Sequence, residues 1–173
     1  MRRPIGLLLA VAALTTLAVI GIVVATRPGT SGIAKGQPVP NVAGTTLDGQ
    51  PFDLATLRGH PVVINFWGPS CVPCRTEFPL LAAKVREHAA DGLVIVGVLT
   101  DDPPDGARAF VSQYGATWPT VIDPGASIKS AYQVVARPQS YFVDRAGTLR
   151  SIQIGEVRDA DFERQYAAIA GGT

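Results

Sequence analysis

A pair of cysteines, Cys71 and Cys74, directly follows the apolar run of residues 62–66 and stands where a helix is expected to begin. They are the only cysteines in the chain. Two thiols at this spacing can form and break a disulfide with little backbone movement. The helix N-terminus lowers the pKa of Cys71 and favours its nucleophilic thiolate. The order of strand, Cys-x-x-Cys and helix therefore predicts a redox-active pair, with a static structural disulfide as the alternative.

A long apolar stretch, residues 5–25, lies near the N-terminus and carries no charged side chain. It is long enough to cross a hydrocarbon core, which takes about 20 apolar residues. Arg2 and Arg3 precede it and favour a cytoplasmic N-terminus, so that the rest of the chain lies on the extracytoplasmic side. We therefore expect residues 1–27 to form an uncleaved, single-pass anchor in a bacterial cytoplasmic membrane. A cleaved signal peptide is the alternative, and it places the domain on the same side.

The charge of the chain is nearly balanced, with 15 basic residues, 14 acidic residues and a net charge of +1. Arg2, Arg3 and Arg27 flank the apolar stretch, so the remainder is slightly acidic. No cluster of basic residues is present, which argues against nucleic acid as a partner. The expected partners are thiols and disulfides of other proteins.

Pro and Gly residues recur between the apolar stretch and the first expected strand. Residues 28–38 therefore indicate a flexible linker, and residues 39–173 are expected to form one domain. Continuous apolar runs at 62–66 and 93–99 predict strands that are buried on both faces.

Helical and hairpin signals occupy the rest of the domain. Apolar residues at helical spacing predict a helix from about 73 to 90, and the acidic residues of 101–105 are expected to cap the next helix. Residues 139–143 and 148–154 indicate a hairpin, followed by a last helix from 159. This order favours an α/β sandwich with a central mixed sheet flanked by helices.

Three segments carry a family resemblance: 59–67 (GHPVVINFW), 71–79 (CVPCRTEFP) and 138–144 (PQSYFVD), the last followed by Gly147. Together they make the domain similar to the thioredoxin superfamily. Within it, the chain resembles the membrane-anchored TlpA/ResA/CcmG-like thiol-disulfide oxidoreductases. The resemblance runs from about residue 39 to residue 170 and implies a thioredoxin-like sandwich.

The resemblance also implies roles for individual residues. Cys71 corresponds to the exposed nucleophile, Cys74 to the buried resolving thiol, and Pro138 to a cis-proline that faces the cysteine pair. Glu77 corresponds to an acidic residue that could exchange a proton with Cys74, and a solvent-facing helical glutamate is the alternative. Asn65 stands where thioredoxin itself has a buried acid, and an amide cannot exchange protons at neutral pH.

Four residues are expected to line the substrate-binding surface: Trp67, Ser70, Pro73 and Arg137. Ser70 departs from the family, which usually has an aromatic residue there, and the small side chain is expected to leave Cys71 more open. Arg137 stands before the predicted cis-proline, where an uncharged residue is common. We expect its guanidinium to lie in solvent, and an orientation that stabilises the Cys71 thiolate is the alternative.

The sequence predicts neither a metal site nor a cofactor. His60 and His88 have no standard zinc-ligand spacing relative to the cysteines. Arg75 follows Cys74, so the Cys-x-x-Cys-His haem-attachment motif is absent. A Cu(I) chaperone that uses both thiolates is an alternative on the same fold, and a thiol peroxidase is another.

The function expected from the resemblance is extracytoplasmic thiol-disulfide exchange by the pair Cys71 and Cys74. The family implies a reductant of protein disulfides, for example the haem-binding cysteines of apocytochrome c, that is recharged by a membrane thiol electron donor. Spacing alone does not decide the direction, because reduction potentials in this superfamily range from about −270 to −120 mV. A protein disulfide oxidase therefore remains the alternative.

Overall fold

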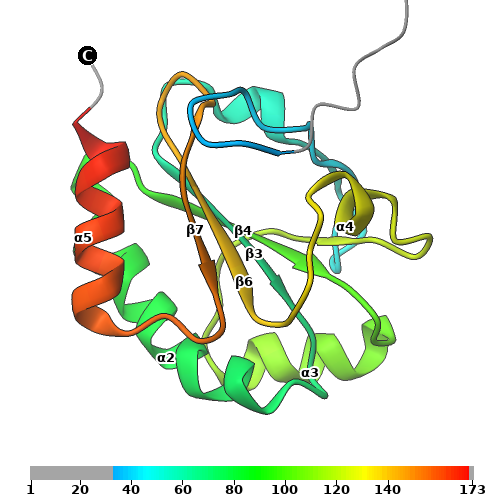
Figure 1. Ribbon diagram of the computed structural model, residues 1–173. Helices are drawn as coiled ribbons and strands as arrows, with labels where there is room; N and C mark the ends of the chain where they lie inside the picture. The colour runs from blue at the N-terminus through cyan, green and yellow to red at the C-terminus, as the bar shows by residue number, and fades with distance from the viewer. Residues whose placement is uncertain (1–32, 172–173) are drawn as a thin grey trace, which may run out of the picture. The chain divides into compact units, whose positions relative to one another are not determined.

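The computed structural model describes residues 33–171, whose centre is a five-stranded sheet (Figure 1). Its strand order is β5-β4-β3-β6-β7. The strands are β3 (Val62–Trp67), β4 (Val94–Leu99), β5 (Thr120–Ile122), β6 (Gln139–Val143) and β7 (Leu149–Ile154). β3, β4 and β5 are parallel, whereas β6 is antiparallel to β3 and β7 is antiparallel to β6. The α/β fold with a central mixed sheet is confirmed.

Helices and short elements surround this sheet. The helices are α2 (Val72–Glu87), α3 (Pro104–Gln113), α4 (Ser127–Ala131) and α5 (Asp159–Ala170), with 3-10 turns at η1 (Leu54–Leu57) and η2 (Ala89–Asp91). A small hairpin of β1 (Ala43–Thr45) and β2 (Pro51–Asp53) precedes them. α2 continues through Pro79 as one helix.

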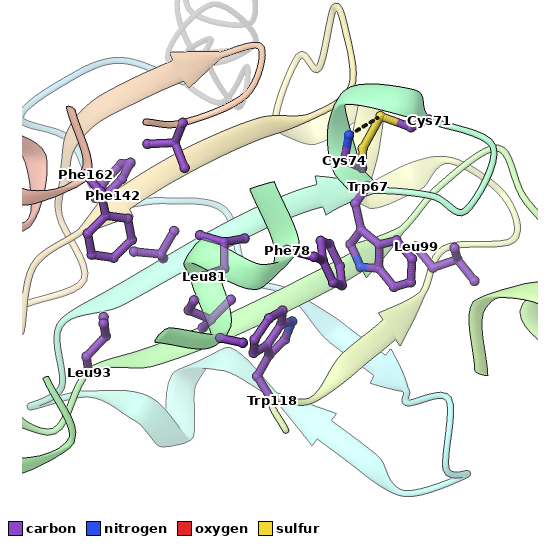
Figure 2. Close-up of a cluster of buried hydrophobic side chains, with 14 of the residues drawn as sticks. Trp67, Cys71, Cys74, Phe78, Leu81, Leu93, Leu99, Trp118, Phe142 and Phe162 are labelled. Atoms are coloured by element: carbon purple, nitrogen blue, oxygen red, sulfur yellow. Dashed lines mark hydrogen bonds between the residues drawn. A yellow bond between two sulfur atoms is a disulfide. The ribbon is translucent and has the colours of Figure 1, made fainter. Parts of the chain in front are cut away.

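The side chains of β3 alternate between two apolar cores, which is why this strand is apolar along its whole length. Val63 and Trp67 belong to the core that also contains residues of α2, α3 and α5. Ile64 and Phe66 belong to the core on the other face, with residues of α4. Figure 1 shows α2, α3 and α5 apart from α4, and Figure 2 shows the first core. β3 is thus fixed from both sides and ends at the cysteine pair.

The loop after β4 differs from the expectation that its acidic residues cap α3. The N-cap residue is Pro103, and it makes no side-chain cap hydrogen bond. The carboxylate of Asp102 is instead bound by Ser70 and Arg137, which lie in other loops. The capping prediction is wrong for Asp102 because these contacts across the fold occupy its side chain.

The predicted anchor of residues 1–27 lies outside the described residues, and so do residues 28–32 of the predicted linker. Between residues 33 and 171, no helix has the length and apolar character to span a membrane. The end of the predicted linker contacts the domain: the N–H of Gly36 donates to the carbonyl of Leu149, and Pro38 forms a bridge with Thr148.

Candidate active site

Cys71 and Cys74 form a disulfide at the junction of β3 and α2. Cys71 is the N-cap residue of α2, and its Sγ accepts a hydrogen bond from the N–H of Cys74 at 3.3 Å. Pro73 occupies the first turn, where its missing N–H costs no helical hydrogen bond. Cys71 is 8% exposed and Cys74 is fully buried. The thiol nearer to solvent is therefore the one at the helix N-terminus, where a thiolate is stabilised.

Trp67, the last residue of β3, lies under the disulfide in the view of Figure 2. Its ring packs against Phe78 of α2 and Phe110 of α3, with centroid distances of 4.7 and 5.0 Å. The side chain is fully buried. Trp67 therefore supports the site from the core, and it presents no surface to a substrate in this state.

Pro138 precedes β6 at the same edge of the sheet as the disulfide. The Arg137–Pro138 peptide bond is cis. Because Gln139 of β6 pairs with Phe66 of β3, Pro138 lies beside the end of β3 that leads into the cysteine pair. This is the placement that the resemblance implies for a cis-proline facing the pair.

Glu77 is buried in α2, one turn after Cys74, and its two carboxylate oxygens accept different hydrogen bonds. Asn65 of β3 donates its amide Nδ2 to Oε1 at 2.8 Å, and the backbone N–H of Val157 donates to Oε2 at 3.0 Å. The same Nδ2 also donates to Oγ of Ser140 in β6 at 2.9 Å. The alternative of a solvent-facing Glu77 is wrong, since the residue is 1% exposed.

The environment of Glu77 disfavours its charged form. Burial raises the pKa of Glu77 to about 7, the hydrogen bonds from Val157 and Asn65 counteract part of this effect, and the nearby charge of Glu156 adds to it. A carboxyl with a pKa near neutrality both gives and takes a proton readily at physiological pH. Such a group beside a redox-active pair is suited to general acid-base work.

Ser70, Asp102 and Arg137 form a second polar group beside the disulfide. Ser70 donates its hydroxyl to Oδ2 of Asp102 at 2.8 Å, and Nη1 of Arg137 lies 2.7 Å from the same oxygen. The expectation of a solvated Arg137 is therefore wrong, because its side chain is 19% exposed and paired.

The two histidines lie away from the cysteines. His60 precedes β3, at the opposite end of that strand from the cysteine pair, and contacts the carbonyl of Gly92. His88 is 3.1 Å from Glu163 of α5 and close to Glu87. The ammonium of Lys84 already lies 2.7 Å from both of these carboxylates. A cation therefore already occupies the centre of this group.

Comparison with known proteins places these residues in a family. The model of the AhpC/TSA family matches residues 35–152. The chain belongs to the AhpC/TSA family. Its relatives include the thiol-disulfide oxidoreductase ResA of Bacillus anthracis, 34% identical over 121 residues, which make up 70% of each chain. ResA of Geobacillus kaustophilus is 31% identical over 158 residues, which cover 90% of this chain and 91% of that one.

Solved structures of similar proteins show the same thioredoxin-like fold. A thiol:disulfide interchange protein from Chlorobium tepidum has a TM-score of 0.73 at 26% identity, covering 80% of this chain and 99% of that chain. A secreted disulfide oxidoreductase of Mycobacterium tuberculosis has a TM-score of 0.66 at 29% identity, covering 73% and 95%. With the Cys71–Cys74 pair present, the family member described here is a thiol-disulfide oxidoreductase.

Sequence reasoning did not find three residues that complete this site. Asp102, Ser140 and the backbone N–H of Val157 come from three different segments, and each contacts a residue that had been singled out. Asp102 and Val157 belong to no local motif, and Ser140 lies within the 138–144 motif, which by itself indicates no role for this side chain. The sequence marks Asp102 only as part of an acidic loop, and its contacts with Ser70 and Arg137 depend on where the end of β4 lies relative to the start of α2.

Proposed function

We propose that this oxidoreductase is a membrane-held, extracytoplasmic reductant of protein disulfides, such as those of apocytochrome c. The observation that carries the chemistry is the buried carboxyl of Glu77, which has a pKa of about 7 and lies one turn after Cys74 on α2. Similarity to ResA proteins supports thiol-disulfide exchange. The reducing direction and the cytochrome substrate rest on the resemblance of the motifs to the TlpA/ResA/CcmG-like branch.

The reaction begins with the reduced cysteine pair. The thiolate of Cys71 attacks one sulfur of a substrate disulfide, so that a mixed disulfide forms and the other substrate sulfur leaves as a thiolate. The thiolate of Cys74 then attacks the sulfur of Cys71, the mixed disulfide breaks, and the second substrate sulfur leaves. Two electrons thus pass from the pair to the substrate. The Cys71–Cys74 disulfide of this structure is the oxidised end state.

The second step requires a deprotonated Cys74, which is fully buried and therefore disfavours a thiolate. Residues three apart on a helix lie on the same face, so Glu77 is placed to take the proton of Cys74. Its hydrogen bonds to Asn65 and Val157 hold the carboxyl inside the protein. Asn65 cannot replace it as a proton acceptor, and we assign the amide the role of orienting Glu77.

The membrane location rests on the sequence before residue 33. The charge-free stretch of residues 5–25 and the preceding Arg2 and Arg3 support a single-pass anchor with the domain outside. The described domain begins shortly after this stretch. Cell fractionation combined with protease treatment of spheroplasts tests this part, because an external domain is digested without lysis. Protection of the domain until lysis would contradict it.

The mechanism is tested by trapping. A Cys74→Ser variant lacks the resolving thiol and should accumulate mixed disulfides through Cys71, which mass spectrometry detects under oxidising conditions. Cys71→Ser is the matched control and should trap nothing. Absence of trapped partners or small thiols in both variants would overturn the assignment of Cys71.

The direction is tested separately by the reduction potential of the pair in glutathione buffers. A potential near that of thioredoxin, about −270 mV, supports a reductant. A potential near that of DsbA, about −120 mV, would reverse the proposal to an oxidase.

A further inference from the structure

Asp102 and Arg137 form an ion pair that touches the residue immediately before Cys71. Arg137 donates Nη1 to Oδ2 of Asp102 at 2.7 Å and Nη2 to the hydroxyl of Ser70 at 3.2 Å. Ser70 donates that hydroxyl to the same carboxylate oxygen at 2.8 Å. Both members of the pair therefore meet at one side chain, next to the nucleophile.

The pair is built into the fold. The side chains of Asp102 and Arg137 are 10% and 19% exposed, and Nη1 of Arg137 also donates to the carbonyl of Thr100. Gly68 provides the room, because a Cβ atom at this position would collide with both Asp102 and Arg137. The pair thus joins the loop after β4, the residue before the cis-proline and the loop before α2.

Three other charged groups lie around this pair. Asp101 approaches Nε of Arg137 at 3.8 Å, and Lys129 of α4 binds Asp101 at 2.6 Å. Arg75 of α2 donates two hydrogen bonds to the carbonyl of Pro69. On the side of Cys74, the titratable group is Glu77. Asp101 and Lys129 are more exposed than the pair itself, so solvent screens them more strongly.

We propose that Asp102 and Arg137 are positioning residues that act through Ser70 and hold the reactivity of the Cys71 thiolate at an intermediate value, the anion and the cation acting in opposite directions. The inference rests on thiol-disulfide exchange at Cys71, but not on the direction of electron flow or on the location of the protein. In this chain, the charged pair that binds Ser70 stands in place of the apolar contact that the usual aromatic residue would make.

The size of the effect follows from the distances. Neighbouring Cα atoms are about 3.8 Å apart, so charges that contact Ser70 lie within about 10 Å of Cys71. A unit charge at that range, partly screened by solvent, shifts a thiol pKa by about 0.5 to 1 unit. Removing the negative charge of Asp102 should lower the pKa of Cys71, and removing the positive charge of Arg137 should raise it.

The test measures the pH dependence of iodoacetamide alkylation of Cys71 in a Cys74→Ser background, where one thiol remains. Asp102→Asn should lower the apparent pKa of Cys71 by about 0.5 to 1 unit and Arg137→Gln should raise it by a similar amount. At a pH below the pKa, each change means a roughly three- to tenfold difference in alkylation rate. The double variant Asp102→Asn/Arg137→Gln should return close to the parent, and Arg137→Lys should keep the parent value.

The exposed pair Asp161 and Arg164 on α5, also 2.7 Å apart, supplies matched controls. Asp161→Asn and Arg164→Gln should leave the profile unchanged. Urea unfolding of each variant shows whether the fold is kept. A purely structural role would move the apparent pKa of Cys71 in the same direction in both single variants, whereas a charge effect moves it in opposite directions. Shifts of equal sign, or none beyond those of the controls, would overturn the proposal. Alkylation needs no protein substrate, so this result is independent of the proposed physiological function.

Discussion

Asn65 donates its side-chain amide to the buried carboxyl of Glu77 at 2.8 Å, across the boundary between β3 and α2. The contact partly compensates a charge that the core disfavours. Burial raises the pKa of Glu77 to about 7 from its ordinary value of 4.5, although this hydrogen bond and that of Val157 lower it. The folded protein therefore binds a proton at Glu77 more tightly than the unfolded chain does, and stability must depend on pH.

Replacement of Glu77 by Gln should remove this pH dependence from the oxidised protein. The folded-state pKa is raised, so the stability linked to Glu77 is full below about pH 4.5 and is lost as pH rises through about 7. The loss is about 3 kcal/mol for a shift of this size. Urea unfolding between pH 5 and 8 should show the decline in the parent protein and a flatter profile in Glu77→Gln.

Asp105→Asn is the control for this measurement, because Asp105 is an exposed carboxyl whose side chain is 96% accessible. The stability of Asp105→Asn should decline between pH 5 and 8 as that of the parent protein does. A Glu77→Gln profile as steep as that of the parent would mean that other groups cause the pH dependence.

The sequence predicts some parts of this site and not others. The cysteine pair, the buried strand before it and the cis-proline belong to contiguous motifs, so their positions could be predicted. The orientation of Glu77 could not, because a solvent-facing helical glutamate has the same local sequence. Hydrogen bonds from Asn65 of β3 and from Val157, in the segment before α5, hold the carboxyl inside the protein. The same holds for Ser70 and Arg137, whose common partner Asp102 is distant in sequence from both.

Replacement of Asn65 by Asp should make the proton at Glu77 still more strongly bound. The new carboxyl has the shape of the amide but would place a second acid against Glu77 in the core, where two carboxylates share one proton. We expect the substitution to cost about 2 to 4 kcal/mol more stability at pH 8 than at pH 5, in addition to the decline of the parent protein. Urea unfolding at both pH values measures the difference. A loss that is equal at the two pH values would contradict charge repulsion as its cause.

Gly97 of β4 should not tolerate even one methyl group. A Cβ atom there would lie 2.5 Å from Oγ1 of Thr120 and 2.8 Å from Nε1 of Trp67, closer than atoms pack in a core. Gly97→Ala should therefore cost about 1 to 3 kcal/mol of unfolding free energy, measured by urea with Trp fluorescence. Gly125→Ala is the matched control, since nothing lies within 4 Å of its added Cβ. Equal stability of the two variants would show that β4 and β5 can shift apart.

Lys84 should fasten α5 to α2. Its ammonium lies 2.7 Å from Asp159 and from Glu163 of α5, as well as from Glu87, and its side chain is only 6% exposed. Lys84→Met keeps the apolar stem but leaves these carboxylates without their cation. Because the carboxylates are themselves partly exposed, we expect a loss of about 1 to 2 kcal/mol at pH 7.

The loss caused by Lys84→Met should shrink on acidification. Hydrogen bonds from Lys84 hold the pKa of Glu163 below its ordinary value, although partial burial raises it. A depressed pKa contributes stability above the ordinary value of 4.5, and this contribution is lost as pH falls through the folded-state pKa. Urea unfolding at pH 7 and pH 3.5 measures the difference, with Arg164→Met as the exposed control. A cost that persists unchanged at pH 3.5 would mean that Lys84 acts through packing of its stem rather than through its charge.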